Sequence, residues 1–403
     1  MLENYRMLDL SRFLPGPFAS HILADMGMDV VKVEETEPRY GMNRDGFTSV
    51  DPTAEEERHE VAHNAVARNK RSIALNLLDP KLRPASQEVF YRLARNADVI
   101  LEGYRPGAVT WMGVDYEAIR KVNPRIIYCS ITGYGQVGPY VKRPGHDGQF
   151  SAVAGLQGRI ATETDGEHGL GVGIADPASG LYAATAILAA ILEREQSGEG
   201  QYIDVPMMSA AMTFGLAGST QKPIAGRGAR GGPSLSILKC KDGKFLSTGN
   251  AETLFWSNFC KALGHEEYIA LRQDRTEAYT NMVLAIQAQM LTRTRDEWLA
   301  ILVPAETCVA PIHESVAVAL DEDPQVKAIG MAWELDHPLE GRVRQIGAPV
   351  RFSRTPSVFK SWAPLLGEHS HDLLHEAGYD DAAIAALEGQ GIVKSAATGV
   401  PAR

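Results

Sequence analysis

Short apolar runs alternate with helical patterns over the first third of the chain. Three helical patterns and three β-branched runs follow one another in the order 17–26, 29–33, 86–95, 98–101, 109–122 and 125–131. Apolar runs of four to seven residues, separated by helices, are typical of parallel strands that are buried on both faces. The pattern therefore predicts an α/β fold with a doubly wound parallel sheet.

The rest of the chain is predicted to contain a long helix and then a smaller α+β region. The helix covers 177–196, with Asp176 at its N-cap, and a strand follows at 201–205. After the Gly- and Arg-rich stretch 226–233, residues 234–323 contain a turn signal around 241–244 and three helical stretches. Three further segments complete the prediction: a polar surface insertion at 39–67, a strand-like run at 347–354, and helices from 367 onward.

Composition narrows the class of protein. With 403 residues the chain is long enough for two domains, and 40 Lys+Arg against 50 Asp+Glu argue against a general nucleic-acid binder. Four cysteines without a CxxC pair fit a reducing compartment. The start lacks a secretory pattern, and the near-apolar stretch 180–192 is too short to cross a bilayer. We therefore expect a cytoplasmic protein with no membrane or nucleic-acid partner.

Asp176 and His146 are the first candidates for chemistry. A carboxylate at a helix N-terminus is most often a cap, although the free N–H groups there would also suit an oxyanion. His146 lies in the turn Gly145-His146-Asp147, where a lone histidine is usually a surface residue. Sites in doubly wound sheets form beyond the carboxyl ends of the strands, so both side chains could reach one crevice.

Basic and histidine-rich segments are weaker candidates. Arg68 to Arg71 precede a strand, and Tyr104 and Arg105 follow one, so each group is either a solvated edge or a phosphate contact. Neither a P-loop nor a GxGxxG motif is present. His369, His371 and His375 resemble a metal cluster on paper. Without an acidic or Cys partner, however, a capped C-terminal helix is favoured and we expect no metal.

Together the motifs resemble the superfamily of family III CoA-transferases and α-methylacyl-CoA racemases. They are LPGP (14–17), LADMG (23–27), RNKRS (68–72), EGYRPG (102–107), GYGQ (133–136), GHD (145–147), SGEGQ (197–201) and LGEH (366–369). The resemblance implies a Rossmann-like large domain of 1–205 and 333–403 that binds CoA. It also implies linkers at 206–222 and 324–332, a small α+β domain at 223–323, and an intertwined homodimer.

The resemblance supports two reactions. In a racemase, His146 and Asp176 would exchange the α-proton of an acyl-CoA thioester, with Glu252 supporting the histidine. In a CoA-transferase, Asp176 would form a mixed anhydride and then an aspartyl-CoA thioester. The presence of Asp176, His146 and Glu252, without the glycine-quartet flap of formyl-CoA transferases, favours the racemase, and the transferase is the alternative.

The resemblance also implies a CoA thioester as substrate, without a tightly bound cofactor. The residues expected to contact CoA are Leu14, Pro15, Arg68, Leu75, Leu77, Tyr104, Arg105 and Trp111. Two positions depart from the family pattern, because Glu35 and Trp111 stand where relatives carry arginines. Other basic residues, Arg68 and Arg105 among them, could compensate, and Trp111 could stack on the adenine.

Overall fold

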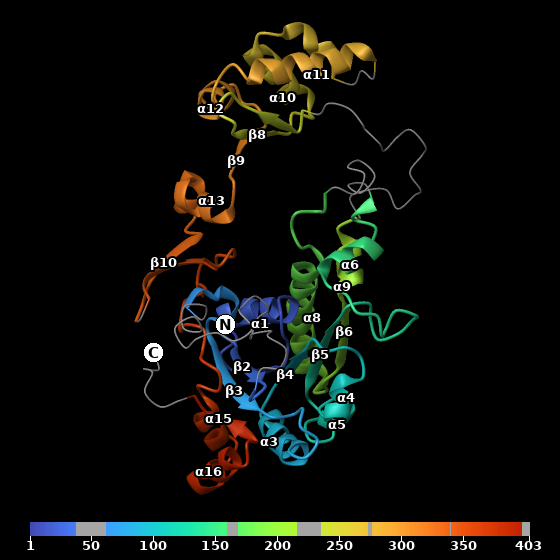
Figure 1. Cartoon of the computed structure of the whole chain (residues 1–403), viewed down its shortest axis with the longest axis vertical. Coiled ribbons are helices and arrows are strands. Elements are labelled where there is room, and N and C mark those ends of the chain that lie inside the picture. Colours follow the sequence, from blue (N-terminus) through green and yellow to red (C-terminus); the bar gives the residue numbers. More distant parts are fainter. Residues whose placement is uncertain (38–61, 159–167, 216–234, 273–275, 339, 397–403) are drawn as a thin grey trace. The chain divides into compact units, whose positions relative to one another are not determined.

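A computed structural model describes residues 1–37, 62–158, 168–215, 235–272, 276–338 and 340–396. The chain forms two compact units, one made of 1–222 and 333–403 and the other of 223–332 (Figure 1). Most of the predicted insertion at 39–67 and the whole stretch 226–233 lie outside the described residues.

A mostly parallel sheet forms the centre of the larger unit. Its described strands are β1 (Arg6–Asp9), β2 (Asp29–Glu34), β3 (Lys70–Leu75), β4 (Val99–Glu102), β5 (Ile127–Thr132), β6 (Tyr202–Pro206) and β12 (Val393–Lys394). Their order is β12-β3-β2-β1-β4-β5-β6, and only β12 runs antiparallel to its neighbour. The strands β4 and β5 are buried throughout. This confirms the predicted α/β class.

Helices cover both faces of this sheet. One apolar core joins the sheet to α3 (Arg83–Arg95), α4 (Ala108–Met112), α5 (Tyr116–Ile119), α15 (Ser370–Glu376) and α16 (Asp381–Gly389). A second core joins it to α1 (Pro15–Asp25) and α8 (Ala175–Ser197). Successive residues of a strand point to opposite faces. Accordingly, Ile100 of β4 belongs to the first core, whereas Val99 and Leu101 belong to the second.

The helix predicted at 109–122 is two short helices instead. Gly113 adopts a left-handed conformation (φ 70°), which ends α4, and Asp115 then caps α5 by accepting the Ala118 N–H at 2.9 Å. Glycine adopts this conformation without the steric cost that a side chain would add. A helix stop that lay inside an apolar pattern was therefore missed.

α8 is longer than the sequence indicated. It has 23 residues and ends at Ser197, with the left-handed Gly198 (φ 80°) as its C-cap. By length and composition alone it could cross a membrane, yet half of its most apolar window is buried inside the protein. Its Gly180 lies against α1, where an added Cβ would come within 2.8 Å of the Pro15 carbonyl oxygen. α8 packs as a core helix, as expected from this close approach.

The smaller unit has its own core. Its described strands β7 (Ile237–Lys239), β8 (Phe245–Thr248) and β9 (Val309–Ile312) form an antiparallel sheet, and the turn between β7 and β8 confirms the hairpin expected around 241–244. The helical segments are α10 (Thr253–Leu263), η2 (Glu266–Leu271), α11 (Glu277–Met290), α12 (Arg295–Leu302), α13 (Val316–Glu322) and α14 (Pro324–Ala328). Trp256, Phe259 and Trp298 are buried among them.

The remaining described elements are η1 (Ala65–Ala67), α6 (Asp147–Val153), α9 (Met207–Thr213), β10 (Ala332–His337) and β11 (Gly341–Ile346). β10 and β11 pair in a two-stranded sheet. The prediction of a strand at 347–354 is wrong, because β11 ends at Ile346, just before this segment. Pro349 has no backbone N–H to give to a strand ladder, so it disfavours a strand across 347–354.

Candidate active site

The parallel strands reverse their order between β1 and β4. From β1 the chain builds β2 and β3 on one side, and from β4 it builds β5 and β6 on the other. Ligands of such sheets bind beyond the carboxyl ends of the strands at this reversal. The segment after β1, residues 10–14, and the segment after β4, residues 103–107, lie at these ends.

Asp176 lies inside the first turn of α8 rather than at its N-cap. The N-cap is Ile174, and Asp176 is half-buried. The cap comes from a distant residue, because Asp147 accepts the Asp176 backbone N–H through Oδ2 at 2.9 Å. The Asp176 N–H is therefore not one of the free N–H groups that would suit an oxyanion. The Asp176 carboxylate is not used as the cap and is available for another role.

His146 precedes α6 and lies beside the loop that follows β1. Its backbone N–H donates to Oε1 of Gln149 at 3.0 Å, and its ring meets that of Phe13 edge-on at 6.1 Å between centroids. Phe13 has a left-handed backbone (φ 66°) within that loop. The His146 side chain is exposed. The histidine turn therefore lies at the carboxyl edge of the sheet.

The pKa of Asp176 is raised to about 6. The main cause is burial, and the negative charge of Asp147 adds to it, whereas His146 opposes the shift. The charges of His146 and Asp147 thus act directly on Asp176. The structure brings the turn at 145–147 and the start of α8 together, although they lie about 30 residues apart in sequence.

A buried ionic network beneath this edge was missed. The Nζ of Lys70 lies 2.7 Å from Ser20 Oγ and 3.7 Å from Asp9 Oδ2, and Asp9 also accepts the Ser11 backbone N–H at 2.9 Å. Ser11 fills the place where Gly16 would carry a Cβ, so the network fixes the path of the Leu-Pro-Gly-Pro segment. Residues 70, 72 and 74 share one face of β3. The large apolar residues of this strand, Ile73 and Leu75, lie on the other face, so the sequence contains no signal that Lys70 is buried.

Glu252 belongs to the smaller unit. It stands at the N-cap of α10, where its side chain makes no capping bond, and it is exposed. Its role beside His146 therefore stays a prediction.

Comparisons with known proteins identify the family. The family model described as CoA-transferase family III matches residues 2–370. The chain belongs to CoA-transferase family III. It is 34% identical to the succinyl-CoA:glutarate CoA-transferase of Homo sapiens over 409 residues, which cover 97% of this chain and 90% of that protein. It is 28% identical to a formyl-CoA:oxalate CoA-transferase of Escherichia coli over 435 residues, which cover 96% and 98%.

Solved structures agree with this assignment. A CAIB/BAIF family protein from Brucella suis matches with a TM-score of 0.73 and 29% identity, and the match covers 93% of this chain and 99% of that one. Rv3272 from M. tuberculosis matches with a TM-score of 0.74 at 24% identity over 92% and 97%, which supports the fold alone. As a family III CoA-transferase, this protein uses CoA thioesters as substrates. The names of the curated relatives fit the transferase alternative better than the racemase interpretation.

Arg68 is not a surface contact for CoA in this family III CoA-transferase. Its side chain has 0% exposure, and its Nη2 donates to Asp25 at 2.6 Å. Its Nη1 donates to the Ile346 carbonyl at 2.7 Å, and its guanidinium lies over the Trp333 ring at 4.5 Å. Because the guanidinium is enclosed and bonded, it ties β3 and α1 to the β10–β11 pair instead.

The other residues expected to contact CoA lie at two depths. The Leu75 and Leu77 side chains are buried in the first core, so only their backbone could face a ligand. Pro15 is buried at the start of α1, and Leu14 beside it is half-buried. Arg105 is exposed just beyond β4. Contact of these residues with CoA stays a prediction.

Two arginines pair with aromatic rings near the departures from the family pattern. Arg12 lies over the Tyr104 ring at 4.6 Å and also pairs with Glu35 at 2.8 Å. Arg83 lies over the Trp111 ring at 3.5 Å, and Trp111 is 53% exposed. Glu35 and Trp111, where the resemblance implies arginines, thus each have an arginine beside them from elsewhere in the sequence.

Proposed function

We propose that this protein transfers CoA between carboxylic acids through an aspartyl-CoA thioester on Asp176. The observation that carries the proposal is the Asp176 carboxylate, which is half-buried at the carboxyl edge of the sheet while Asp147 takes over the capping bond. Whole-length similarity to named CoA-transferases supports the same reaction. Because the names of several relatives contain succinyl-CoA or succinate and glutarate, we propose short dicarboxylic acids as the acyl groups.

The proposed transfer consists of four successive substitutions at carbonyl carbons. The Asp176 carboxylate attacks the thioester carbonyl of the donor and displaces CoA thiolate, which leaves a mixed anhydride. The thiolate then attacks the Asp176 carbonyl, releases the donor acid and forms the aspartyl-CoA thioester. The acceptor carboxylate attacks that thioester and displaces the thiolate again. Attack of the thiolate on the acceptor acyl group yields the new acyl-CoA and restores Asp176.

The direct test uses succinyl-CoA with glutarate as acceptor, and oxalate as a second acceptor, with separation of the CoA esters by chromatography. The proposal predicts that glutaryl-CoA forms only when both donor and acceptor are present. A wider panel of acids would locate the preferred substrate if these are poor. If no acyl-CoA in the panel exchanges its acid, the transferase assignment is refuted.

The activity should fall at acid pH with an apparent pKa near 6. Only the ionised Asp176 is nucleophilic, and with a pKa of about 6 it is roughly nine-tenths ionised at pH 7. Below pH 6, kcat/KM should drop about tenfold per pH unit. The measurement is kcat/KM between pH 4.5 and 8.5 with a saturating acceptor.

The variant Asp147→Asn should shift this acid limb to lower pH. The negative charge of Asp147 raises the pKa of Asp176, and the amide oxygen of an asparagine can still accept the Asp176 N–H. Burial, the larger cause, is unchanged, so the limb should stay above the usual range of an aspartate. If the apparent pKa of the acid limb were unchanged or higher in the variant, the titration would belong to a group other than Asp176.

Racemisation is a second candidate, because the charge of His146 acts directly on Asp176. A racemase should incorporate deuterium at the α-carbon of a 2-methylacyl-CoA in D₂O without any acid acceptor. Exchange without an acceptor, combined with no acyl transfer, would replace the first proposal with this one.

His146→Ala separates the two candidates. A transferase needs no base at the α-carbon, so we expect it to keep turnover within about tenfold of the parent. A racemase should lose most of its turnover. The comparison is kcat in the donor–acceptor assay together with deuterium uptake, measured on the same preparations.

We further propose that the larger unit holds CoA and that two chains form the intertwined homodimer implied by the resemblance. For the racemase candidate we propose that Glu252 supports the protonated form of His146, as the resemblance implies. The mass of the native protein in solution tests the dimer. The KM of a Glu252→Gln variant tests the role of Glu252.

A further inference from the structure

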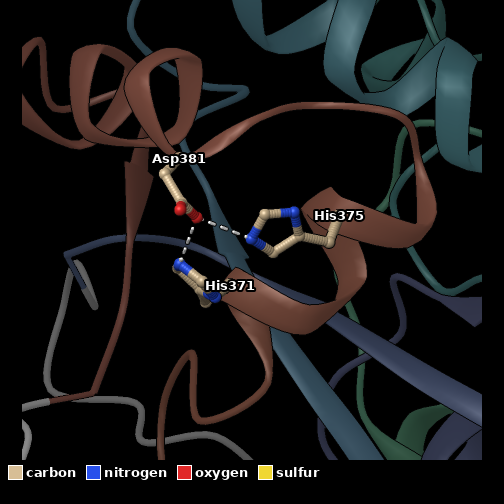
Figure 2. Close-up of side chains that lie close together, drawn as sticks. All are labelled: His371, His375 and Asp381. Carbon is tan, nitrogen blue, oxygen red and sulfur yellow. Dashed lines mark hydrogen bonds and ion pairs between the residues drawn. The ribbon is translucent and has the colours of Figure 1, made fainter.

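Two histidines and an aspartate converge on the surface of the larger unit (Figure 2). His375 Nε2 lies 2.9 Å from Asp381 Oδ1, and His371 Nε2 lies 3.5 Å from the same oxygen. The two imidazole rings are 4.6 Å apart between centroids, at 70° to each other. All three candidate ligand atoms lie within 4.8 Å of one another.

The acidic partner that was not identified from the sequence comes from the next helix. His371 and His375 are four residues apart, so they lie on one face of α15. Gly378, with φ 86°, turns the chain back after α15, and Tyr379 N–H bonds to the Leu374 carbonyl. This turn places Asp381, the first residue of α16, opposite the two rings.

We propose that His371, His375 and Asp381 form a surface site for a divalent transition metal ion of the zinc type. Imidazole nitrogens with one carboxylate oxygen are a ligand set that Zn²⁺ accepts, with water in the remaining position. Donor atoms about 2.0–2.1 Å from a tetrahedral Zn²⁺ lie about 3.3 Å apart. The two N···O separations of 2.9 and 3.5 Å bracket that value, and the two imidazole nitrogens lie within 4.8 Å of each other.

Burial beneath the cluster holds its elements in place. Leu373 and Leu374 of α15 have 0% exposure and Ile384 of α16 has 1%, so the buried faces of both helices are fixed in the first core. The three ligand side chains point outward instead, with exposures of 54%, 41% and 85% for His371, His375 and Asp381. A metal ion and its water can therefore reach them without opening the core.

The cluster is separate from the proposed reaction. α15 and α16 belong to the first core, whereas α8, which carries Asp176, belongs to the second core on the other face of the sheet. Metal binding should therefore stabilise the pair α15–α16 and leave CoA transfer unchanged. The site goes beyond the proposed function and does not depend on it.

The test uses the full chain without a histidine tag, made metal-free, in a Cys308→Ser background because Cys308 is an exposed thiol. Zn²⁺ binding is measured by calorimetry, and Co²⁺ is added as a probe whose visible bands report tetrahedral coordination. His371→Ala and His375→Ala should each weaken Zn²⁺ binding by at least about tenfold, the lower end of what even an outer hydrogen-bond partner contributes to a metal site. The Co²⁺ bands should disappear with either substitution.

His265→Ala is the matched control. His265 also pairs with a carboxylate, Glu267 at 2.9 Å, but the metal-ligand geometry found among the described residues is confined to the 371–381 cluster. This variant should bind Zn²⁺ like the parent. Thermal melts in chelator show whether each variant folds, and Zn²⁺ should raise the melting temperature of the parent but not of the double histidine variant. Equal Zn²⁺ binding by the parent and by the double variant His371→Ala/His375→Ala would refute the proposed site. Absence of Zn²⁺ binding by the parent would also refute it.

Discussion

Asp176→Asn should abolish CoA transfer, with kcat lowered about 10⁴-fold or more. An amide cannot form the mixed anhydride or the aspartyl-CoA thioester, so the substitution removes the covalent route as a whole. The measurement is the turnover of succinyl-CoA with glutarate, followed at several enzyme concentrations so that trace activity is detected.

Detection of the aspartyl-CoA thioester distinguishes a nucleophilic Asp176 from one that only supports the fold. Parent protein mixed with acyl-CoA should carry CoA on the peptide that contains Asp176, as seen by mass spectrometry. Hydroxylamine should convert the same residue to a hydroxamate and stop turnover. The Asp176→Asn variant should show neither modification. A CoA adduct on another residue would move the nucleophile away from Asp176.

Asp204→Asn is the matched control for removal of a carboxylate. Burial also raises the pKa of Asp204, and its Oδ2 accepts the Gln136 backbone N–H at 3.2 Å, a bond that an amide oxygen can keep. We expect turnover close to that of the parent. A loss as large as that of Asp176→Asn would indicate a general effect of charge at this edge of the sheet.

The Asp176→Asn protein should also be at least as stable as the parent at pH 8. A carboxyl whose folded pKa is raised to about 6 binds its proton more tightly in the folded than in the unfolded chain. The parent should therefore gain stability as the pH falls through 6 toward the unfolded pKa, and the variant should lack that gain. Thermal melts at pH 8 and pH 4.5 check both expectations and show that lost activity is not lost folding.

The sheet could be predicted because its signals are local. The runs at 29–33, 98–101 and 125–131 are mostly apolar, and both faces of the strands they predicted are covered by helices. The ends of elements depend on single residues within a pattern. Gly113 and Pro349 each moved a boundary that the surrounding apolar pattern did not indicate.

The site was only partly predictable because its decisive contacts join distant segments. The segments that carry His146 and Asp176 are both at the predicted edge, yet the bond from Asp147 to the Asp176 N–H spans 29 residues and has no sequence signal. The enclosure of Arg68 depends on Ile346, which is 278 residues away. A basic cluster has the same sequence whether it faces a phosphate or a buried carboxylate.

Arg68→Ala should lower the free energy of unfolding by about 3 kcal/mol, because it removes the guanidinium that pairs with the buried Asp25 carboxylate. Asp25 is 6% exposed and receives both Nε and Nη2 of Arg68, at 3.1 and 2.6 Å. Asn69 Nδ2 still donates to Asp25 Oδ1 at 2.8 Å and His21 Nε2 lies 3.7 Å from Oδ2, so the cost should lie at the lower end for a broken buried ion pair.

The matched control is Arg71→Ala. Arg71 is 24% exposed and pairs with Asp29 and Glu376, both at 2.7 Å. Arg6 also pairs with both carboxylates, so neither is left without a cation and the loss of Arg71 should cost less than that of Arg68. Urea unfolding of the three proteins measures the difference.

A double-mutant cycle with Asp25→Asn shows whether the cost comes from the ion pair. Once Asp25 is neutral, Arg68→Ala leaves no unpaired carboxylate, so the combined cost should be clearly smaller than the sum of the single costs. The KM for succinyl-CoA in the folded Arg68→Ala protein should stay near the parent value, because an enclosed guanidinium cannot reach a phosphate. If Arg68→Ala left stability unchanged and raised the KM, the result would instead support the phosphate contact considered for the basic cluster 68–71.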